Sequence, residues 1–299
     1  GTKTLEEYTL EGAMAYSLND RLTLAGKINF QSADYAKRKD PRSYSQWMDL
    51  DASVGARYSL ASGKGAFGIS LNYTKTIETV AEKLFGTLDR QYYYLVDYGG
   101  SFGKVEIIDG DNGYLSVSNE RPMFNQFFGG SAQAEFKAEG VTAFLDLGAA
   151  YRNGYFGKKA SGSVRFCDFD GMRYNLDTRI SFRTGDFLNR IQGSWNVLTS
   201  LNKENSYRVS TTPGQSSEIQ YFGSQETGDR IVGRLNARYS IEKQTERSDG
   251  HLKPAPWAMS VGFERFSLNQ TATSYPFYRK QRLAQNTVNV SAVRNFPIR

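Results

Sequence analysis

The sequence predicts an all-β protein, a transmembrane antiparallel β-barrel of the outer-membrane type. Three observations predict it. Apolar and polar side chains alternate in blocks, the connections between blocks alternate between short and long, and aromatic side chains mark both ends of the apolar face. A tilted strand of about 9–11 residues crosses a bilayer, and lipid on one face with water on the other requires such alternation.

The first two blocks form a hairpin. Between Tyr8 and Leu18, the even-numbered positions carry apolar or aromatic side chains and Gly12, whereas the odd ones are polar or alanine. After the turn at 19–20, the alternation resumes over residues 22–31. A period of two residues indicates a strand, because successive side chains of a strand point to opposite faces.

The same alternation predicts nine further strands, which brings the total to about eleven. Their expected ranges are 48–60, 67–73, 128–138, 141–151, 174–182, 191–197, 231–241, 257–263 and, for the last, about 287–296.

The connections predict which end of each strand faces which side of the membrane. Short links are expected at 19–20, 61–66, 139–140 and 184–186, and long ones at about 32–46, 78–126, 152–172, 198–229 and 269–285. Outer-membrane barrels have short periplasmic turns and long external loops. Residues 1–299 are therefore expected to form a single β-barrel domain with five long external loops, and the polar link 242–255 is a longer periplasmic turn.

The strand count predicts a larger barrel. The first strand enters from the outside and the last ends at the periplasm, an odd number that cannot close a bacterial single-chain barrel. We therefore expect at least twelve strands and interpret this chain as the C-terminal part of a longer barrel.

Aromatic residues of the apolar face form two girdles, as at the two interfaces of a membrane. One lies beside the short turns: Tyr16, Tyr58, Phe67, Phe136, Phe182, Tyr239, Trp257 and Phe296. The other lies at the opposite strand ends: Tyr8, Phe30, Tyr73, Phe128, Tyr151, Tyr174, Trp195 and Phe263. A soluble β-sandwich also alternates, but it has no reason to place aromatics at both ends of its buried face.

Composition narrows the class of protein further. No stretch approaches the roughly 20 apolar residues of a transmembrane helix, and the formal charge of +6 is too dispersed to indicate nucleic-acid binding. Cys167 is the only cysteine, so no internal disulfide is possible. We expect the bacterial outer membrane as the location, its lipid as a partner, and no cofactor.

Arginines dominate the face predicted to line the lumen. They are Arg57, Arg179, Arg183, Arg190, Arg230, Arg234 and Arg238. Such residues commonly pair with lumen carboxylates or with a plug, and the alternative is a pathway for anions or sugar acids.

Clustered tyrosines mark the longest predicted loop, 78–126, as a candidate recognition surface. They are Tyr92, Tyr93, Tyr94 and Tyr98. Tyrosines offer flat amphipathic contacts to a glycan or a partner protein, although they could equally pack within the loop.

A set of short motifs resembles a known family. Asp40-Pro41-Arg42, then Met48-Asp49-Leu50 opening a strand with Gly55 and Tyr58, then a glycine-rich turn and Gly68, resemble a Bacteroidota-type outer-membrane β-barrel family of unknown function. The resemblance implies association with TonB-dependent uptake systems, and hence a TonB-dependent transporter or surface lipoprotein as partner. It supplies no catalytic residues.

The expected function is a non-enzymatic transport component of the outer membrane, either an accessory subunit of a TonB-dependent nutrient-uptake assembly or a pore. One alternative is a surface binding or adhesion protein that its barrel anchors. Another is an outer-membrane hydrolase, for which the single histidine, His251, would be the candidate base. His251 lies in the polar link 242–255, where a solvated turn residue is the simpler interpretation.

Overall fold

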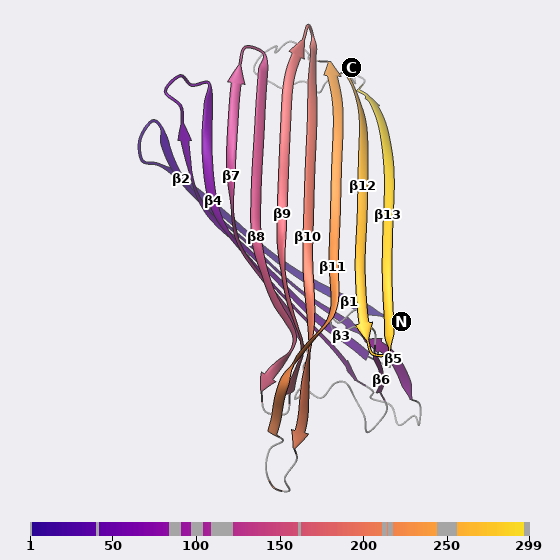
Figure 1. The fold of residues 1–299 in the computed structure, drawn as a ribbon. Helices are drawn as coiled ribbons and strands as arrows, with labels where there is room; N and C mark the ends of the chain where they lie inside the picture. The colour runs from indigo at the N-terminus through magenta and orange to yellow at the C-terminus, as the bar shows by residue number, and fades with distance from the viewer. Residues whose placement is uncertain are drawn as a thin grey trace.

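The main feature of the protein is an antiparallel sheet of eleven strands, in which neighbours follow chain order (Figure 1). The computed structural model describes residues 2–39, 42–83, 91–96, 104–108, 122–160, 163–210, 214, 218–243 and 256–295. The strands of the sheet are β1 (Lys3–Ser17), β2 (Leu22–Lys37), β3 (Arg42–Ser59), β4 (Gly65–Lys83), β7 (Met123–Ala138), β8 (Val141–Ala160), β9 (Ser163–Thr184), β10 (Phe187–Ser210), β11 (Glu218–Lys243), β12 (Trp257–Ser274) and β13 (Phe277–Arg294). β1 and β13 are its two edges.

A second, two-stranded sheet lies between β4 and β7 in the sequence. It pairs β5 (Tyr92–Val96) with β6 (Lys104–Ile108), antiparallel and in the register Tyr92↔Ile108 to Val96↔Lys104. Among the described residues there is no helix long and apolar enough to cross a membrane.

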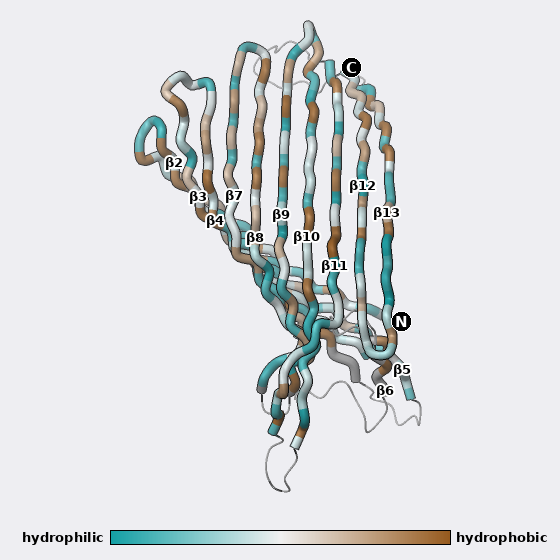
Figure 2. Tube along the Cα trace, in the orientation of Figure 1, coloured by the Kyte–Doolittle hydropathy of each residue, from teal (hydrophilic) through white to brown (hydrophobic). Residues whose placement is uncertain are grey.

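The two faces of the main sheet differ as the alternation predicts. Large apolar side chains of one parity are exposed along β1 to β4, including Met14 at 76% and Leu71 at 69%. Brown and teal segments alternate along the strands accordingly (Figure 2). Exposed girdle residues on this face are Tyr8, Tyr16, Tyr58, Phe67, Phe128, Phe136, Tyr151, Tyr174, Trp195, Tyr239 and Phe263.

The strand register gives the tilt of the sheet. Phe67, in the girdle beside the short turns, and Phe263, in the opposite girdle, lie in one row of directly paired residues. The opposite girdle on β4 is at Tyr73, six residues further along, and six pairing steps separate β4 from β12. The girdles therefore shift by one residue per strand, which corresponds to a strand tilt of ~35°, a value typical of membrane barrels.

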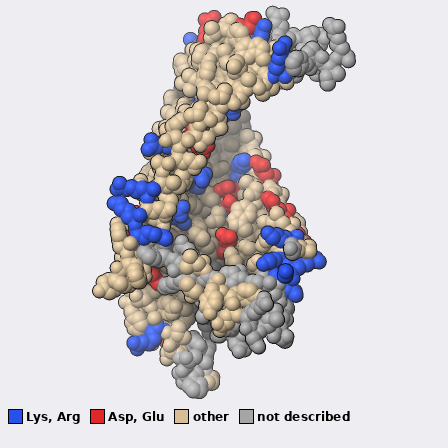
Figure 3. All heavy atoms as spheres, turned by 90° about the vertical axis from the view of Figure 1, so that its right-hand side faces the viewer, with Lys and Arg blue, Asp and Glu red and all other residues tan. Residues whose placement is uncertain are grey.

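The sheet is rolled, so that the two arms face each other across a hollow. β2 to β4 run obliquely behind the strands from β7 onward (Figure 1), and Arg173 Nη2 on β9 donates to Thr74 Oγ1 on β4 at 3.3 Å. Basic and acidic side chains line the hollow (Figure 3). Glycine permits the tight curvature, because a Cβ on Gly129 of β7 would collide with the Ala149 carbonyl of β8.

The ladder between β9 and β10 is interrupted at one point. Pairing skips Gly171 and Met172 of β9 against Thr199 and Ser200 of β10. Thr199 Oγ1 replaces the missing ladder bonds, accepting from the Met172 N–H at 2.9 Å and donating to the Met172 carbonyl at 3.3 Å. A Cβ on Gly171 would collide with the Thr199 carbonyl. This close approach therefore requires glycine.

Two further irregularities lie on β11. Register shifts against β10 occur between Asn202 and Lys203 and between Ser206 and Tyr207. Each leaves one β11 residue without a directly opposite partner, Thr227 and Phe222 respectively. Single-residue bulges of this kind bend a strand and increase its twist.

Four of the five predicted long loops are mostly strand, which corrects the sequence-based expectation. The segments 32–46, 152–172, 198–229 and 269–285 belong largely to β2 and β3, β8 and β9, β10 and β11, and β12 and β13. The last strand likewise begins at Phe277 rather than near residue 287. Beyond the membrane both faces meet water, so hydrophobic alternation fades while the antiparallel ladder still satisfies the backbone hydrogen bonds.

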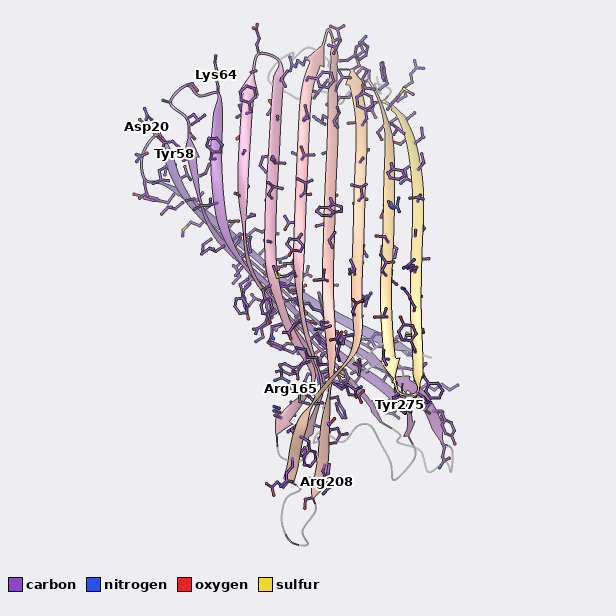
Figure 4. The ribbon with its side chains drawn as sticks, viewed as in Figure 1. Asp20, Tyr58, Lys64, Arg165, Arg208 and Tyr275 are labelled. Atoms are coloured by element: carbon purple, nitrogen blue, oxygen red, sulfur yellow. The ribbon has the colours of Figure 1, made fainter. Side chains whose placement is uncertain are left out.

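The remaining links are described only in part. The segment 78–126 contains the end of β4, the β5–β6 sheet and the start of β7. Of the polar link 242–255, residues 244–255 lie outside the described residues, and so does Phe296. The short turns at 19–20, 61–64, 139–140 and 185–186 are present at one end of the sheet. Asp20, Tyr58 and Lys64 mark this end, opposite Arg165, Arg208 and Tyr275 (Figure 4).

Candidate functional site: an arginine pocket on the concave face

Four depressions of the described part of the sheet are large enough for a small molecule. Two, of about 730 and 600 Å³, lie on the apolar face of β1 to β4 and are lined by girdle and lipid-facing residues such as Met14 and Leu71. The third, of about 490 Å³, lies on the concave face between β7 and β11. Its polar lining is formed by Arg152, Arg173, Arg230, Arg234, Asn196, Ser200 and Asn202. This one combines a concave position with both polar and apolar side chains that could recognise a solute, whereas the fourth depression, of about 410 Å³, is lined mainly by polar and charged residues.

Arg152 on β8 is the most buried charge of this arginine pocket. Its Nε and Nη2 donate to Asn125 Oδ1 at 3.0 and 2.5 Å, and Nη1 donates to Ser200 Oγ at 3.0 Å. Its guanidinium carbon lies 5.2 Å from the ring centroid of Phe169. Burial, with a smaller effect from nearby Arg230, lowers the pKa of Arg152 to about 10, so the side chain is still a cation at neutral pH.

Ser200 reaches Arg152 at the interrupted ladder between β9 and β10. Gly171 lies between them in the strand register and carries no side chain that would separate them. Ser200 Oγ also lies 3.3 Å from Asn202 Oδ1, to which it donates. Phe169, which is 1% exposed, supports the same region from β9. The guanidinium of Arg152 is thus held by neutral partners only, namely Asn125, Ser200 and Phe169.

Arg173 on β9 connects the pocket to the opposite arm of the sheet. Its guanidinium lies 4.3 Å from the ring centroid of Phe127 and donates to Thr74. Asp49 and Asp51 on β3 attract its charge. The charge of Arg173 is therefore partly balanced within the protein.

Arg230 and Arg234 on β11 lack such balance. Arg234 packs with its guanidinium carbon 5.8 Å from the ring centroid of Phe266. Within the described part of the chain, neither arginine nor Arg152 has a carboxylate at salt-bridge distance. The pocket therefore concentrates positive charge, and guanidinium groups of this kind bind carboxylate or phosphate oxygens.

The other predicted lumen arginines lie elsewhere on the concave face. Arg57 contacts Glu135 at 3.1 Å, and Arg190 contacts Glu242 at 3.1 Å. Arg179 and Arg238 line a smaller depression together with Asp177, and Arg238 also donates to Ser260 at 3.0 Å. Arg183 is exposed next to the 185–186 turn. The structure thus brings Arg230 and Arg234 together and separates them from the remaining five.

Sequence reasoning missed Arg152 and Arg173. Arg152 lies in the segment expected to be the loop 152–172, and Arg173 lies between that segment and the expected strand 174–182. Their signal was the strand parity continued past the outer girdle residues Tyr151 and Tyr174, since both arginines then face the lumen.

The predicted tyrosine cluster falls partly within the β5–β6 sheet. Tyr93 is 65% exposed, and its hydroxyl donates to Gln91 Oε1 at 3.0 Å. Tyr92 is half-buried. Tyr94 belongs to β5, although its side chain is outside the described set, as is all of Tyr98. Their role in recognition stays a prediction.

Metal binding receives no candidate site from the described residues. These residues contain no cluster of three or more His, Cys, Asp or Glu side chains that could hold a metal ion. His251 lies outside the described residues.

The sequence matches one family over residues 1–299, described as Family of unknown function (DUF6850). The chain belongs to this family. The match confirms the expectation that the family is one of unknown function. A Bacteroidota origin stays a prediction. No curated protein matches the chain.

Solved structures resemble the chain over nearly its whole length. The siderophore receptor PiuA from Acinetobacter baumannii superposes with a TM-score of 0.50 at 10% identity, covering 96% of this chain and 44% of the receptor. BauA, the ferric preacinetobactin receptor from Acinetobacter baumannii, gives 0.44 at 10% identity, with 97% and 44% covered. The alcaligin outer membrane receptor FauA from Bordetella pertussis gives 0.43 at 9% identity, with 98% and 51% covered.

This chain has the fold of part of an outer-membrane receptor barrel, as the strand alternation predicted. It spans about 44% of the length of PiuA. An antiparallel sheet with a lipid-facing apolar band between two aromatic girdles is the architecture of bacterial outer-membrane barrels.

Proposed function

We propose that the chain forms part of the wall of a transport barrel in the bacterial outer membrane and has no catalytic role. One observation carries the proposal: a single sheet has an apolar outer face bounded by aromatic girdles and a charged concave inner face. Lipid covers such an outer face, and water or solute occupies the inner one. The fold shared with a siderophore receptor supports a role in transport.

Within this function, the chain acts as an accessory subunit of a TonB-dependent nutrient-uptake assembly or as a pore. The test uses the full-length protein, purified from outer membranes and reconstituted into liposomes and planar bilayers. A pore gives stepwise conductance, and an accessory subunit gives no conductance but co-purifies with a TonB-dependent transporter. A protein that stays out of the membrane fraction, or that shows neither property, contradicts the proposal.

A second candidate function, surface binding, is favoured by the β5–β6 sheet. Its exposed side chains include Tyr93, Leu95 at 76% and Val105 at 64%. Exposed apolar and aromatic residues on a small protruding sheet are typical of a contact surface for a protein such as a transporter or surface lipoprotein.

The tyrosines test this candidate. Replacing Tyr92, Tyr93 and Tyr94 together by alanine should leave assembly of the main sheet intact but weaken co-purification with the partner, because buried tyrosines supply much contact area at low entropic cost. Heat-modifiable electrophoretic mobility checks assembly. Undiminished co-purification by the triple variant would remove the binding surface from consideration.

A further inference from the structure

The arginine pocket has a charge balance that suggests what occupies it. Building on the proposed transport function, we infer that the pocket between β7 and β11 binds an organic anion through a carboxylate or phosphate group, with Arg230 and Arg234 as the contacting residues. The β-sheet fold itself does not require an anion-binding site, so the inference depends on these arginine side chains and their surroundings.

The first argument is local charge. Arg152, Arg230 and Arg234 line the pocket without a carboxylate at salt-bridge distance among the described residues. Gathering like charges is unfavourable unless a counter-charge is present, and here the half-buried cation Arg152 adjoins the exposed Arg230 and Arg234. A bound anion supplies that counter-charge.

The adjoining depression provides the contrast. It measures about 410 Å³ and is lined by Lys27 and Arg173 together with Asp51 and Asp177. Its cations and carboxylates balance each other, and Thr74 Oγ1 donates to Asp51 Oδ1 at 2.7 Å. The excess of positive charge in the arginine pocket is therefore not shared by the depression next to it.

The second argument is that the N–H donors of Arg152 are used within the protein, whereas those of Arg230 and Arg234 are available to a ligand. Each guanidinium nitrogen of Arg152 already donates to Asn125 or Ser200, so we assign Arg152 to fixing the local potential rather than to contacting the ligand. The side chains of Arg230 and Arg234 make no hydrogen bond with any described residue. Their planar guanidinium groups retain the paired N–H donors that fit carboxylate and phosphate oxygens.

The third argument is the apolar remainder of the pocket. Met123, Leu198 and Val232 line it beside the arginines, within a volume of about 490 Å³. An inorganic ion would leave these side chains without contact, whereas the carbon skeleton of an organic anion covers them. The ligand class is therefore a small organic molecule with one or more oxyanion groups.

The experiment measures binding directly in detergent-solubilised full-length protein. Glucuronate and glucose 6-phosphate serve as carboxylate and phosphate probes, and glucose serves as the uncharged probe of matched size, each titrated by calorimetry. We expect at least one anionic probe to bind and glucose not to bind. The double variant Arg230→Gln plus Arg234→Gln should weaken binding of the anionic probe at least about tenfold, since each lost charge-assisted hydrogen bond contributes on that scale.

Arg183→Gln is the matched control, because it removes one lumen-facing positive charge outside the pocket. It should change the affinity less than about twofold. Arg230→Lys plus Arg234→Lys keeps both charges and should retain part of the affinity, which guards against loss of binding through misfolding. Absence of binding by either anionic probe, or equal affinity in the double Gln variant and the wild type, overturns the inference.

The binding assay does not depend on transport. Anion binding by a protein that neither conducts nor joins an uptake assembly would contradict the proposed function and leave the site standing. Transport without anion binding would do the reverse.

Discussion

At the scale of single residues, the environment of each lumen arginine decides its role. Glu135 receives both Arg57 and Lys137, at 3.1 and 2.8 Å, in a half-exposed setting. Exposed ion pairs of this kind contribute little to stability, typically about 0–1 kcal/mol. Arg230 and Arg234, in a pocket without a carboxylate, gain far more from a bound anion than Arg57 could.

The opposite faces of one strand give a residue-scale prediction. Leu71→Arg should lower the free energy of unfolding in lipid vesicles by about 2–4 kcal/mol, because Leu71 is exposed on the apolar face between the girdles. Asn72→Arg is the control on the adjacent, lumen-facing position, which lines the same depression as Asp51. Its cost should be much smaller in denaturant titration. Equal costs would mean that the faces are misassigned.

The sequence predicted the lumen orientation of Arg230 and Arg234 but not the pocket they share. Strand parity assigns a side chain to a face, and the pocket additionally depends on which strands are adjacent and where the ladder breaks. Arg152 meets Ser200 across Gly171, which lies between them in the register of β8, β9 and β10. Hydrophobic periodicity does not give that register.

At the scale of strands, the kink between β9 and β10 links backbone geometry to the site. Gly171 allows the Thr199 carbonyl to approach, and the hydroxyl of Thr199 takes over the hydrogen bonds of the missing pairs. Ser200, the next residue, then faces Arg152. A change in this backbone segment should therefore reach the pocket.

The corresponding prediction is that Gly171→Ala destabilises the folded protein by about 1–3 kcal/mol, the usual cost of forcing an atom into an occupied space. It should also weaken anion binding by displacing Ser200. Gly26→Ala is the control, because its added Cβ would make only ordinary contacts, the nearest at 3.8 Å. Thermal unfolding followed by circular dichroism measures both variants. Similar unfolding temperatures for the two would show that the kink tolerates a side chain.

The sequence predicted the eleven strands of the sheet and their order but underestimated their length. Within the membrane, lipid and water impose the alternation that reveals a strand. Outside it, residues such as those of β12 and β13 between 264 and 287 stay paired while both faces meet water. Hydrogen bonding therefore continues where the sequence pattern stops.

At the scale of the whole molecule, tilt and roll are set together. Because the girdles shift by one residue per strand, each girdle lies parallel to the membrane plane only if the strands tilt. A tilted sheet of twisted strands curls. The contact between Arg173 of β9 and Thr74 of β4 shows how far the curl has gone. Because the sheet has an odd number of antiparallel strands in chain order, β1 begins and β13 ends at opposite ends of the sheet (Figure 1).

Orientation in the membrane gives the whole-molecule prediction. Ser274→Cys, in the β12–β13 hairpin, should react with a membrane-impermeant thiol reagent on intact cells, because long hairpins of outer-membrane barrels face outward. Ser62→Cys, in the short link between β3 and β4, should react only after the cells are opened. Cys167 is buried and should contribute no signal. Reversed labelling would invert the topology.

The two bulges of β11 bear on how the family can vary in length. Thr227 and Phe222 are the residues without an opposite partner, so deleting either one leaves every remaining pair of β10 and β11 in place and each paired side chain on its face. Single-residue insertions and deletions inherited in this hairpin should therefore gather at the two bulges, where the ladder absorbs one residue without turning its neighbours to the opposite face.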